Sequence, residues 1–126
     1  MLILDPIGIR LLLPLLSAIR QAGAKPDGQA PGQLEPSFKR MMVYIFVGTR
    51  GGRNRAKIVE FLSREPSNLN QVSERLSLDY KTVQHHVRLL EENGVVVPSE
   101  KGAYGAVYFL TPYFERNFQA IKSMWG

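Results

Sequence analysis

The stretch NLNQVSERLSLDYKTVQHHVRLLEENGVVVP, residues 68–98, decides the fold of this chain of 126 residues. Its second part predicts a helix, because Asp79 is a good N-cap and the Asn-Gly pair at 93–94 is a good C-terminal stop. The apolar stripe between these two signals, at spacings i, i+4 and i+7, consists of Val83, Val87 and Leu90. A stripe at that spacing is typical of a helix with one buried face.

The opposite face of this predicted helix carries residue types that read DNA. It holds Lys81, Gln84, His85 and Arg88, and it has no acid before Glu91. Gln and Arg can make bidentate contacts to purine edges, and Lys and His can serve bases or phosphates. The face has two interpretations, a DNA-recognition surface or an ordinary solvated helix face.

The neighbouring segments favour the first interpretation. Residues 69–76 predict a short helix, and residues 77–79 form a turn that leads into the helix already described. Downstream, residues 95–97 predict a strand that ends at Pro98, and residues 106–110 predict a return strand after a turn that contains Gly. A helix-turn-helix followed by a β-hairpin is a winged helix. We therefore predict a mostly α fold with a small β-hairpin, an α+β winged helix-turn-helix.

The segment DYKTVQHHVRLLEENGVV, residues 79–96, resembles the recognition helix of archaeal winged-helix regulators of the ArsR-like group. The pattern T-V-x-H-H-[LV]-x-x-L-x-x-x-G-[LV] is matched by Thr82, Val83, His85, His86, Val87, Leu90, Gly94 and Val95. The flanking GTRGGRNRAKIVEFL and YGAVYFLT are also similar to that group, so the resemblance covers roughly residues 47–111. It implies a DNA-binding transcription regulator, and it is specific for the fold rather than for the operator or the signal.

We expect the recognition helix to enter the major groove and the wing to lie on the backbone. The residues predicted to approach the groove are Tyr80, Lys81, Gln84, His85 and Arg88, with Thr82 near a phosphate.

A basic region precedes the helix-turn-helix. From residue 38 to residue 57 every charged residue is Lys or Arg. A basic loop that opens a helix can hold phosphates through its side chains and free backbone N–H groups, whereas the alternative is a loop that only aids solubility. The predicted phosphate contacts are Arg50, Arg53, Arg55 and Lys57, together with Lys101 and Tyr104 at the wing.

Composition agrees with a polyanion partner and gives little support for an enzyme. The net charge is +5, and the chain has no cysteine and therefore no thiolate metal site. Many ArsR-like repressors sense metals through cysteines, so the chain departs from that pattern. His85 and His86 are adjacent and lie about 100° apart on a helix, which is poor geometry for one ion, and His86 lies nearer the apolar side. We predict no catalytic residue, no metal, no cofactor and a cytoplasmic location.

The chain divides into three parts by composition. Residues 1–20 are strongly apolar, residues 21–35 are rich in Gly, Ala, Gln and Pro and read as a flexible linker, and residues 36–126 form the winged-helix domain. The first part is interrupted by charges and prolines, so we expect a segment that seeks a protein partner rather than a spanning helix. The alternative is a helix that lies on a membrane surface.

Two apolar stripes flank the helix-turn-helix. Pro36 suits the first turn of a helix that ends near Gly48, with a strand over residues 41–47 as the competing prediction. Asn54 is the expected cap of the next helix, and Thr111 is the expected cap of a C-terminal one. The stripes consist of Phe38, Met41, Met42, Ile45 and Phe46, and of Phe114, Phe118, Ile121 and Trp125.

These stripes either pack against the domain itself or pair two chains. Both exceed what we expect a three-helix core with one hairpin to cover. One recognition helix reads only a few base pairs, so a homodimer on two half-sites about 34–36 Å apart is the usual remedy. We predict the nine stripe residues as the dimer seam. The competing function is a winged-helix module that binds protein or RNA, with or without membrane contact through residues 1–19.

Overall fold

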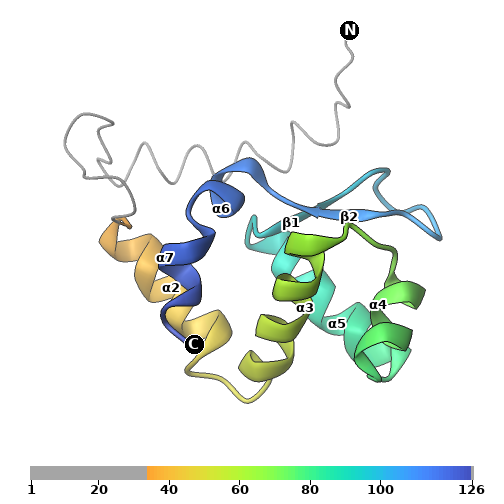
Figure 1. Ribbon diagram of the computed structural model, residues 1–126, viewed down its shortest axis with the longest axis horizontal. Coiled ribbons are helices and arrows are strands. Elements are labelled where there is room, and N and C mark those ends of the chain that lie inside the picture. The colour runs from red at the N-terminus through yellow and green to blue at the C-terminus, as the bar shows by residue number, and fades with distance from the viewer. Residues whose placement is uncertain (1–33, 126) are drawn as a thin grey trace, which may run out of the picture.

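The computed structural model describes residues 34–125, and in them the chain forms a mostly helical fold with one two-stranded antiparallel hairpin (Figure 1). This is the predicted winged helix-turn-helix. The predictions for residues 1–20, 21–33 and 126 lie outside the described residues. The elements in chain order are α2 (Pro36–Phe46), α3 (Gly52–Arg64), α4 (Leu69–Leu76), α5 (Tyr80–Glu92), β1 (Val96–Pro98), β2 (Tyr108–Leu110), α6 (Pro112–Arg116) and α7 (Phe118–Lys122).

Helix α2 forms where a strand was the competing prediction. The carboxylate of Glu35 accepts hydrogen bonds from the backbone N–H groups of Ser37, at 2.8 Å, and of Phe38, at 3.0 Å. Pro36 occupies the first turn, where it sacrifices no hydrogen bond. The strand alternative was wrong because this N-terminal cap and the i, i+4 spacing of the buried residues outweigh the β propensity of Val, Tyr, Ile and Phe. Glu35 therefore belongs with the domain and not with the linker.

Helix α3 begins two residues before the predicted cap. Its N-cap is Gly51, and the N–H of Gly52 donates to the carbonyl of Thr49 at 3.0 Å. A Cβ at Gly52 would stand 2.5 Å from the backbone oxygen of Phe46, so only glycine lets the chain turn this tightly out of α2. Asn54 is thus inside the helix, and its prediction as the cap was wrong.

Helices α4 and α5 form the helix-turn-helix with the predicted bounds. Asn68 caps α4 in a reciprocal capping box with Gln71. The turn between the helices passes through Ser77, which has the left-handed φ of 55°. Asp79 caps α5 by accepting from the N–H groups of Lys81 and Thr82, at 3.0 and 3.2 Å. These local hydrogen bonds fix the angle at which α5 leaves α4.

The wing is a short hairpin in which Val96 pairs with Leu110 and Pro98 with Tyr108. β2 is shorter than predicted, and β1 is shifted by one residue, so that Pro98 is its last residue rather than the residue beyond it. The N–H of Tyr108 also donates to the carbonyl of Ser67 at 2.8 Å, which ties the return strand to the segment before α4. The wing is therefore anchored to the helix-turn-helix at its base.

The C-terminal stripe is divided between two short helices, with Trp125 beyond the end of the second. The chain breaks at Asn117, whose side chain donates to the carbonyl of Tyr113 at 2.9 Å. Thr111 occupies the N-cap position of α6 but makes no side-chain cap. Its buried hydroxyl donates to the carbonyl of Gly94 at 2.7 Å, so it joins α6 to the end of α5 instead.

The two apolar stripes pack against each other inside one chain, where α2 lies beside α6 and α7 (Figure 1). The ring of Phe46 lies 4.6 Å from that of Trp125 and 6.0 Å from that of Phe114, centroid to centroid. An aromatic cluster between α2 and the C-terminal segment buries most of the two stripes, so the expectation that one domain cannot cover them was wrong for six of the nine residues. Met41, Phe118 and Trp125 remain partly exposed. The stripe residues buried in this core are Phe38, Met42, Ile45, Phe46, Phe114 and Ile121.

Candidate nucleic-acid interface

Helix α5 presents the predicted recognition face to solvent. Its inner stripe of Val83, Val87 and Leu90 is at most 1% exposed and fixes the rotation of the helix about its axis. The side chains that therefore point outward, all exposed, are Lys81, Gln84, His85 and Arg88. Tyr80 and Thr82, at the N-terminal end, are half-buried. Gln84 and Arg88 can each make two hydrogen bonds to one base, and Lys81 and His85 can add further donors.

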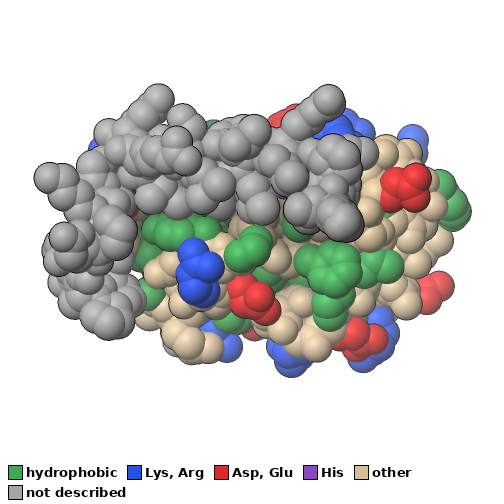
Figure 2. All heavy atoms as spheres, turned by 90° about the horizontal axis from the view of Figure 1, so that it is seen from above, with side chains coloured by type: hydrophobic (Ala, Val, Ile, Leu, Met, Phe, Trp, Pro, Cys, Tyr) green, Lys and Arg blue, Asp and Glu red, His purple; other side chains and the backbone are tan. Residues whose placement is uncertain are grey.

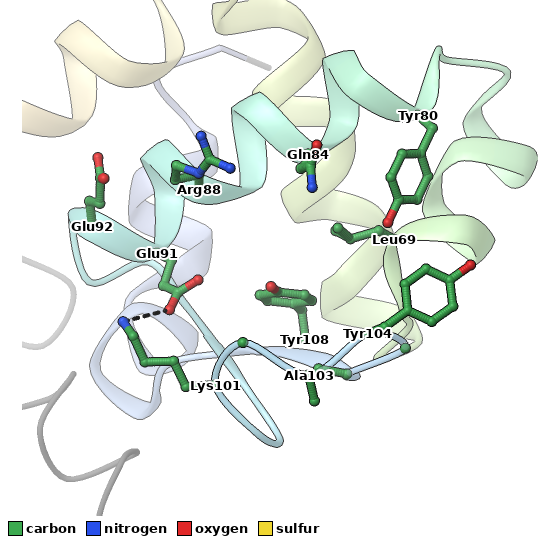
Figure 3. A pocket seen from close by; sticks show the side chains of 13 residues that line it. Leu69, Tyr80, Gln84, Arg88, Glu91, Glu92, Lys101, Ala103, Tyr104 and Tyr108 are labelled. Atoms are coloured by element: carbon green, nitrogen blue, oxygen red, sulfur yellow. Dashed lines mark hydrogen bonds and ion pairs between the residues drawn. The ribbon is translucent and has the colours of Figure 1, made fainter.

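A cleft of about 540 Å³ separates α5 from the wing (Figure 3). Gln84 and Arg88 line it from the recognition helix, and Tyr104 and Tyr108 line it from the hairpin. Burial raises the pKa of Tyr108, and the neighbouring Glu91 adds to the rise. Of the predicted DNA contacts, the structure gathers Tyr80, Gln84, Arg88, Lys101 and Tyr104 around this one cleft.

Two side-chain contacts hold the far end of the wing against the helices. The ammonium of Lys101 lies 3.5 Å from the carboxylate of Glu91 on α5 (Figure 3). The amide of Asn70 on α4 donates to the hydroxyl of Tyr104 at 3.1 Å. Both wing residues predicted to touch phosphates thus already have a protein partner. Any contact from Lys101 to a phosphate competes with its attraction to Glu91.

The predicted basic loop is mostly the start of α3: Arg50 precedes the helix, whereas Arg53, Arg55 and Lys57 lie in it, and three of these four cations are exposed. Arg50, Arg53 and Lys57 are exposed and free to approach a polyanion. Arg55 is only 4% exposed and faces the protein interior. Its prediction as a phosphate contact was wrong, because its guanidinium is consumed by three hydrogen bonds within the fold.

Arg55 links α3 to two other elements. Its Nε donates to the carbonyl of Ile45 at 2.9 Å, and its Nη2 donates to the hydroxyl of Thr49. Its Nη1 lies 3.1 Å from Nδ1 of His86 on α5. Since an arginine can only donate, Nδ1 of His86 must accept, and that requires the neutral ring with its proton on Nε2. Burial lowers the pKa of His86, and the nearby charges of Arg55 and His85 lower it further.

The hydrogen bond between Arg55 and His86 was not predicted from the sequence, although the spacing of residues in α3 indicates that Arg55 is buried. Arg55 precedes Ile58 by three residues and Leu62 by seven, so it lies on the same stripe of α3 as these buried residues. Helical spacing, taken before charge, assigns Arg55 to the inward face. The placement of His86 on the inner side of α5 agrees with its 7% exposure.

A metal site was also searched for among the described side chains. Among residues 34–125, no group of three or more His, Cys, Asp and Glu side chains comes together as such a site would require. Figure 2 shows the molecule from above the view of Figure 1, and the acidic and basic side chains visible there are interspersed. Within the same residues, none of the helices has the length and apolar character needed to cross a bilayer.

The fold and this face define the class of protein, a winged helix-turn-helix with an outward recognition helix. Residues 53–97 match the family model described as "Bacterial regulatory protein, arsR family". The match runs from the first turn of α3, through α4 and α5, into β1. A search of curated proteins finds no match to the chain. Residues 53–97 are therefore similar to the helix-turn-helix of that family, and this similarity indicates a DNA-binding transcription regulator. This match does not show the predicted resemblance to an archaeal group within the family.

Proposed function

We propose that this protein is a sequence-specific transcription regulator that binds double-stranded DNA as a homodimer. In this proposal α5 lies in the major groove and the wing lies on the sugar–phosphate backbone. The observation that carries it is the division of α5 into a buried apolar stripe and an exposed face of Lys81, Gln84, His85 and Arg88. The exposed cations before and within the first turns of α3, Arg50, Arg53 and Lys57, supply positive charge for flanking phosphates.

Selection of bound DNA from a random pool is the first test. A regulator that reads bases enriches one motif, whereas a generic polyanion binder enriches none. On the enriched site, Gln84→Ala and Arg88→Ala should each weaken binding by about 1–3 kcal/mol and relax the preference at one base pair. Arg116→Ala on α6 is the matched control, since it removes an exposed arginine that lies outside the recognition face.

Three outcomes of this experiment have different meanings. If a motif is enriched but neither variant changes the affinity or the base preference, α5 is not the element that reads the bases. Equal binding to all DNA sequences would reduce the function to non-specific binding. No DNA binding at any salt concentration would favour the alternative, a winged-helix module for protein or RNA.

The proposal of a homodimer is supported by an exposed apolar surface that is not buried in the core. On the outer side of α2, Val43, Tyr44 and Val47 are 38%, 63% and 50% exposed. A helix that is apolar on the side away from its core is typical of an interface. Of the nine residues predicted for the seam, the partly exposed Met41, Phe118 and Trp125 remain in the proposal.

Sedimentation equilibrium tests the dimer directly. A stable seam would bury on the order of 1,200–2,000 Å² in total. Val47→Asp should give monomers that bind one half-site weakly, with unchanged circular dichroism because Val47 is not in the core. A wild-type chain that stays monomeric at tens of micromolar, free and on DNA, would reject the dimer.

A further inference from the structure

The Arg55–His86 hydrogen bond joins the two regions that are proposed to touch DNA. Arg55 belongs to the second turn of α3, directly after the exposed Arg50 and Arg53. His86 is the residue of α5 that follows the exposed His85. The bond between them, 3.1 Å from Nη1 to Nδ1, therefore holds the N-terminal part of α3 against the middle of α5.

The other end of the guanidinium is held at the C-terminus of α2. Its Nε donates to Ile45, one of the last carbonyls of that helix. Thr49, which accepts from Nη2, in turn donates to the carbonyl of Tyr44 at 2.9 Å. A cation at this end of a helix is favoured by the partial negative charge of the unpaired carbonyls. Arg55 thus has a fixed position from which to hold His86.

The chain passes close to this pair. A Cβ at Gly51 would stand 2.5 Å from Cε1 of His86 and 2.6 Å from Nη1 of Arg55. The N-cap position of α3 is therefore packed directly on the hydrogen bond. A change in the distance between the two side chains must move either α5 or the loop that carries Arg50.

The bond depends on the protonation state of His86. The charged and titratable groups near the Arg55–His86 pair are His85 from α5, beside His86, and Tyr44 from α2, beside Arg55. Among the described residues no carboxylate forms an ion pair with Arg55 or His86. A protonated His86 would donate from both ring nitrogens and would face a second cation at hydrogen-bond distance. Protonation therefore breaks the bond and adds a repulsion.

We propose that His86 is a positioning residue for DNA binding. Its neutral ring holds the N-terminal part of α3 at the spacing that lets Arg53, and Arg50 just before the helix, reach phosphates while α5 reads bases. DNA affinity therefore falls when His86 is protonated. This inference rests on the proposed function.

Binding to the enriched DNA site between pH 5.5 and pH 7.5 tests the inference. His85 also titrates and would bind phosphates better when charged, so the measurements are made in a His85→Gln background. In that background the affinity should fall toward pH 5.5 by up to about 10-fold, the limit set at that pH by a pKa that does not exceed the ordinary 6.5 of histidine. His86→Asn keeps an acceptor near the position of Nδ1 and cannot be protonated. It should flatten the pH profile and bind better at pH 7.5 than His86→Leu, which has no acceptor.

A second measurement needs no DNA. Nitrogen-15 spectra of the histidine ring should show His86 at pH 7.5 with Nδ1 unprotonated and the proton on Nε2. Because its pKa is lowered in the folded protein, the unfolded chain binds the proton more readily. Stability is therefore complete above about pH 6.5, the ordinary pKa of histidine, and declines as the pH falls below it. His86→Asn should remove this part of the decline.

The outcomes separate this inference from the proposed function. Specific DNA binding whose pH profile is the same with and without the His86→Asn change would overturn the positioning role and leave the function standing. A proton on Nδ1 at pH 7.5 would overturn the role as well, because Nδ1 could not then accept. No DNA binding at any pH would overturn both. A fall in affinity that disappears in His86→Asn, with Nδ1 unprotonated, would support the role.

Discussion

Phe46 tests whether the apolar stripe of α2 is part of the core of one chain or of a seam between two chains. The sequence places it in an apolar stripe that either pairs two chains or packs within one. In the structure its ring is 2% exposed and contacts the rings of Trp125 and Phe114. We expect Phe46→Ala to destabilise the fold of the single chain, independently of any partner.

The size of the loss follows from burial. An aromatic side chain removes about 150–250 Å² from water, which at about 25 cal/mol per Å² corresponds to roughly 4–6 kcal/mol as an upper estimate. Alanine retains part of this, and measured Phe→Ala changes in cores cost about 3–5 kcal/mol. We therefore expect a loss of about 4 kcal/mol. A domain of this size has a total stability of about 5–15 kcal/mol, so the variant should be marginally folded.

Urea unfolding followed by circular dichroism at several protein concentrations gives the measurement. Phe46→Leu is the milder variant, with an expected loss of about 1–2 kcal/mol, in case the alanine variant does not fold. Tyr44→Ala is the matched control, because Tyr44 is an aromatic residue of the same helix but 63% exposed. Its effect on the isolated chain should stay within about 0.5 kcal/mol.

Two results would refute this account of Phe46. One is a loss below about 1 kcal/mol for Phe46→Ala. The other is a loss that grows with protein concentration as dimers form, since this is the behaviour of a residue in an intermolecular seam. Trp125, the single tryptophan of the chain, gives an independent probe, because removal of the ring beside it should change its fluorescence.

Three further changes have defined outcomes. Arg53→Ala should lower the slope of log affinity against log salt by about 0.9, as loss of one phosphate contact does, and an unchanged slope would mean that Arg53 faces away from DNA. Ser77→Gly relieves the left-handed backbone at φ 55° and should raise the melting temperature by a few degrees, on the order of 0.5 kcal/mol; a lower melting temperature would show that no strain is stored there. Glu91→Gln removes a negative charge from the cleft and releases Lys101, so DNA should bind about two- to fivefold more tightly at low salt. A weaker complex would show that the ion pair positions the wing for binding.

The order and nature of the elements were determined by local sequence. The side chains of Asn68 and Asp79 accept hydrogen bonds from free backbone N–H groups a few residues away and so begin α4 and α5. The helical spacing of the apolar residues assigns each helix a buried side. These are short-range effects that a reader of the sequence can evaluate. They were sufficient for the helix-turn-helix, for the hairpin and for the outward face of α5.

Only the tertiary structure decided where the charged and apolar side chains are used. Arg55 looks like its exposed neighbours Arg50 and Arg53, but the carbonyls at the end of α2 and the ring of His86 meet it from elements that are distant in the chain. The stripes on α2 and α6–α7 looked excessive because nothing local shows that they cover each other. Hydrogen-bond partners and burial of this kind depend on distances between elements. The sequence by itself determined which surfaces exist, and the packing of the helices decided which of them remain free to bind DNA.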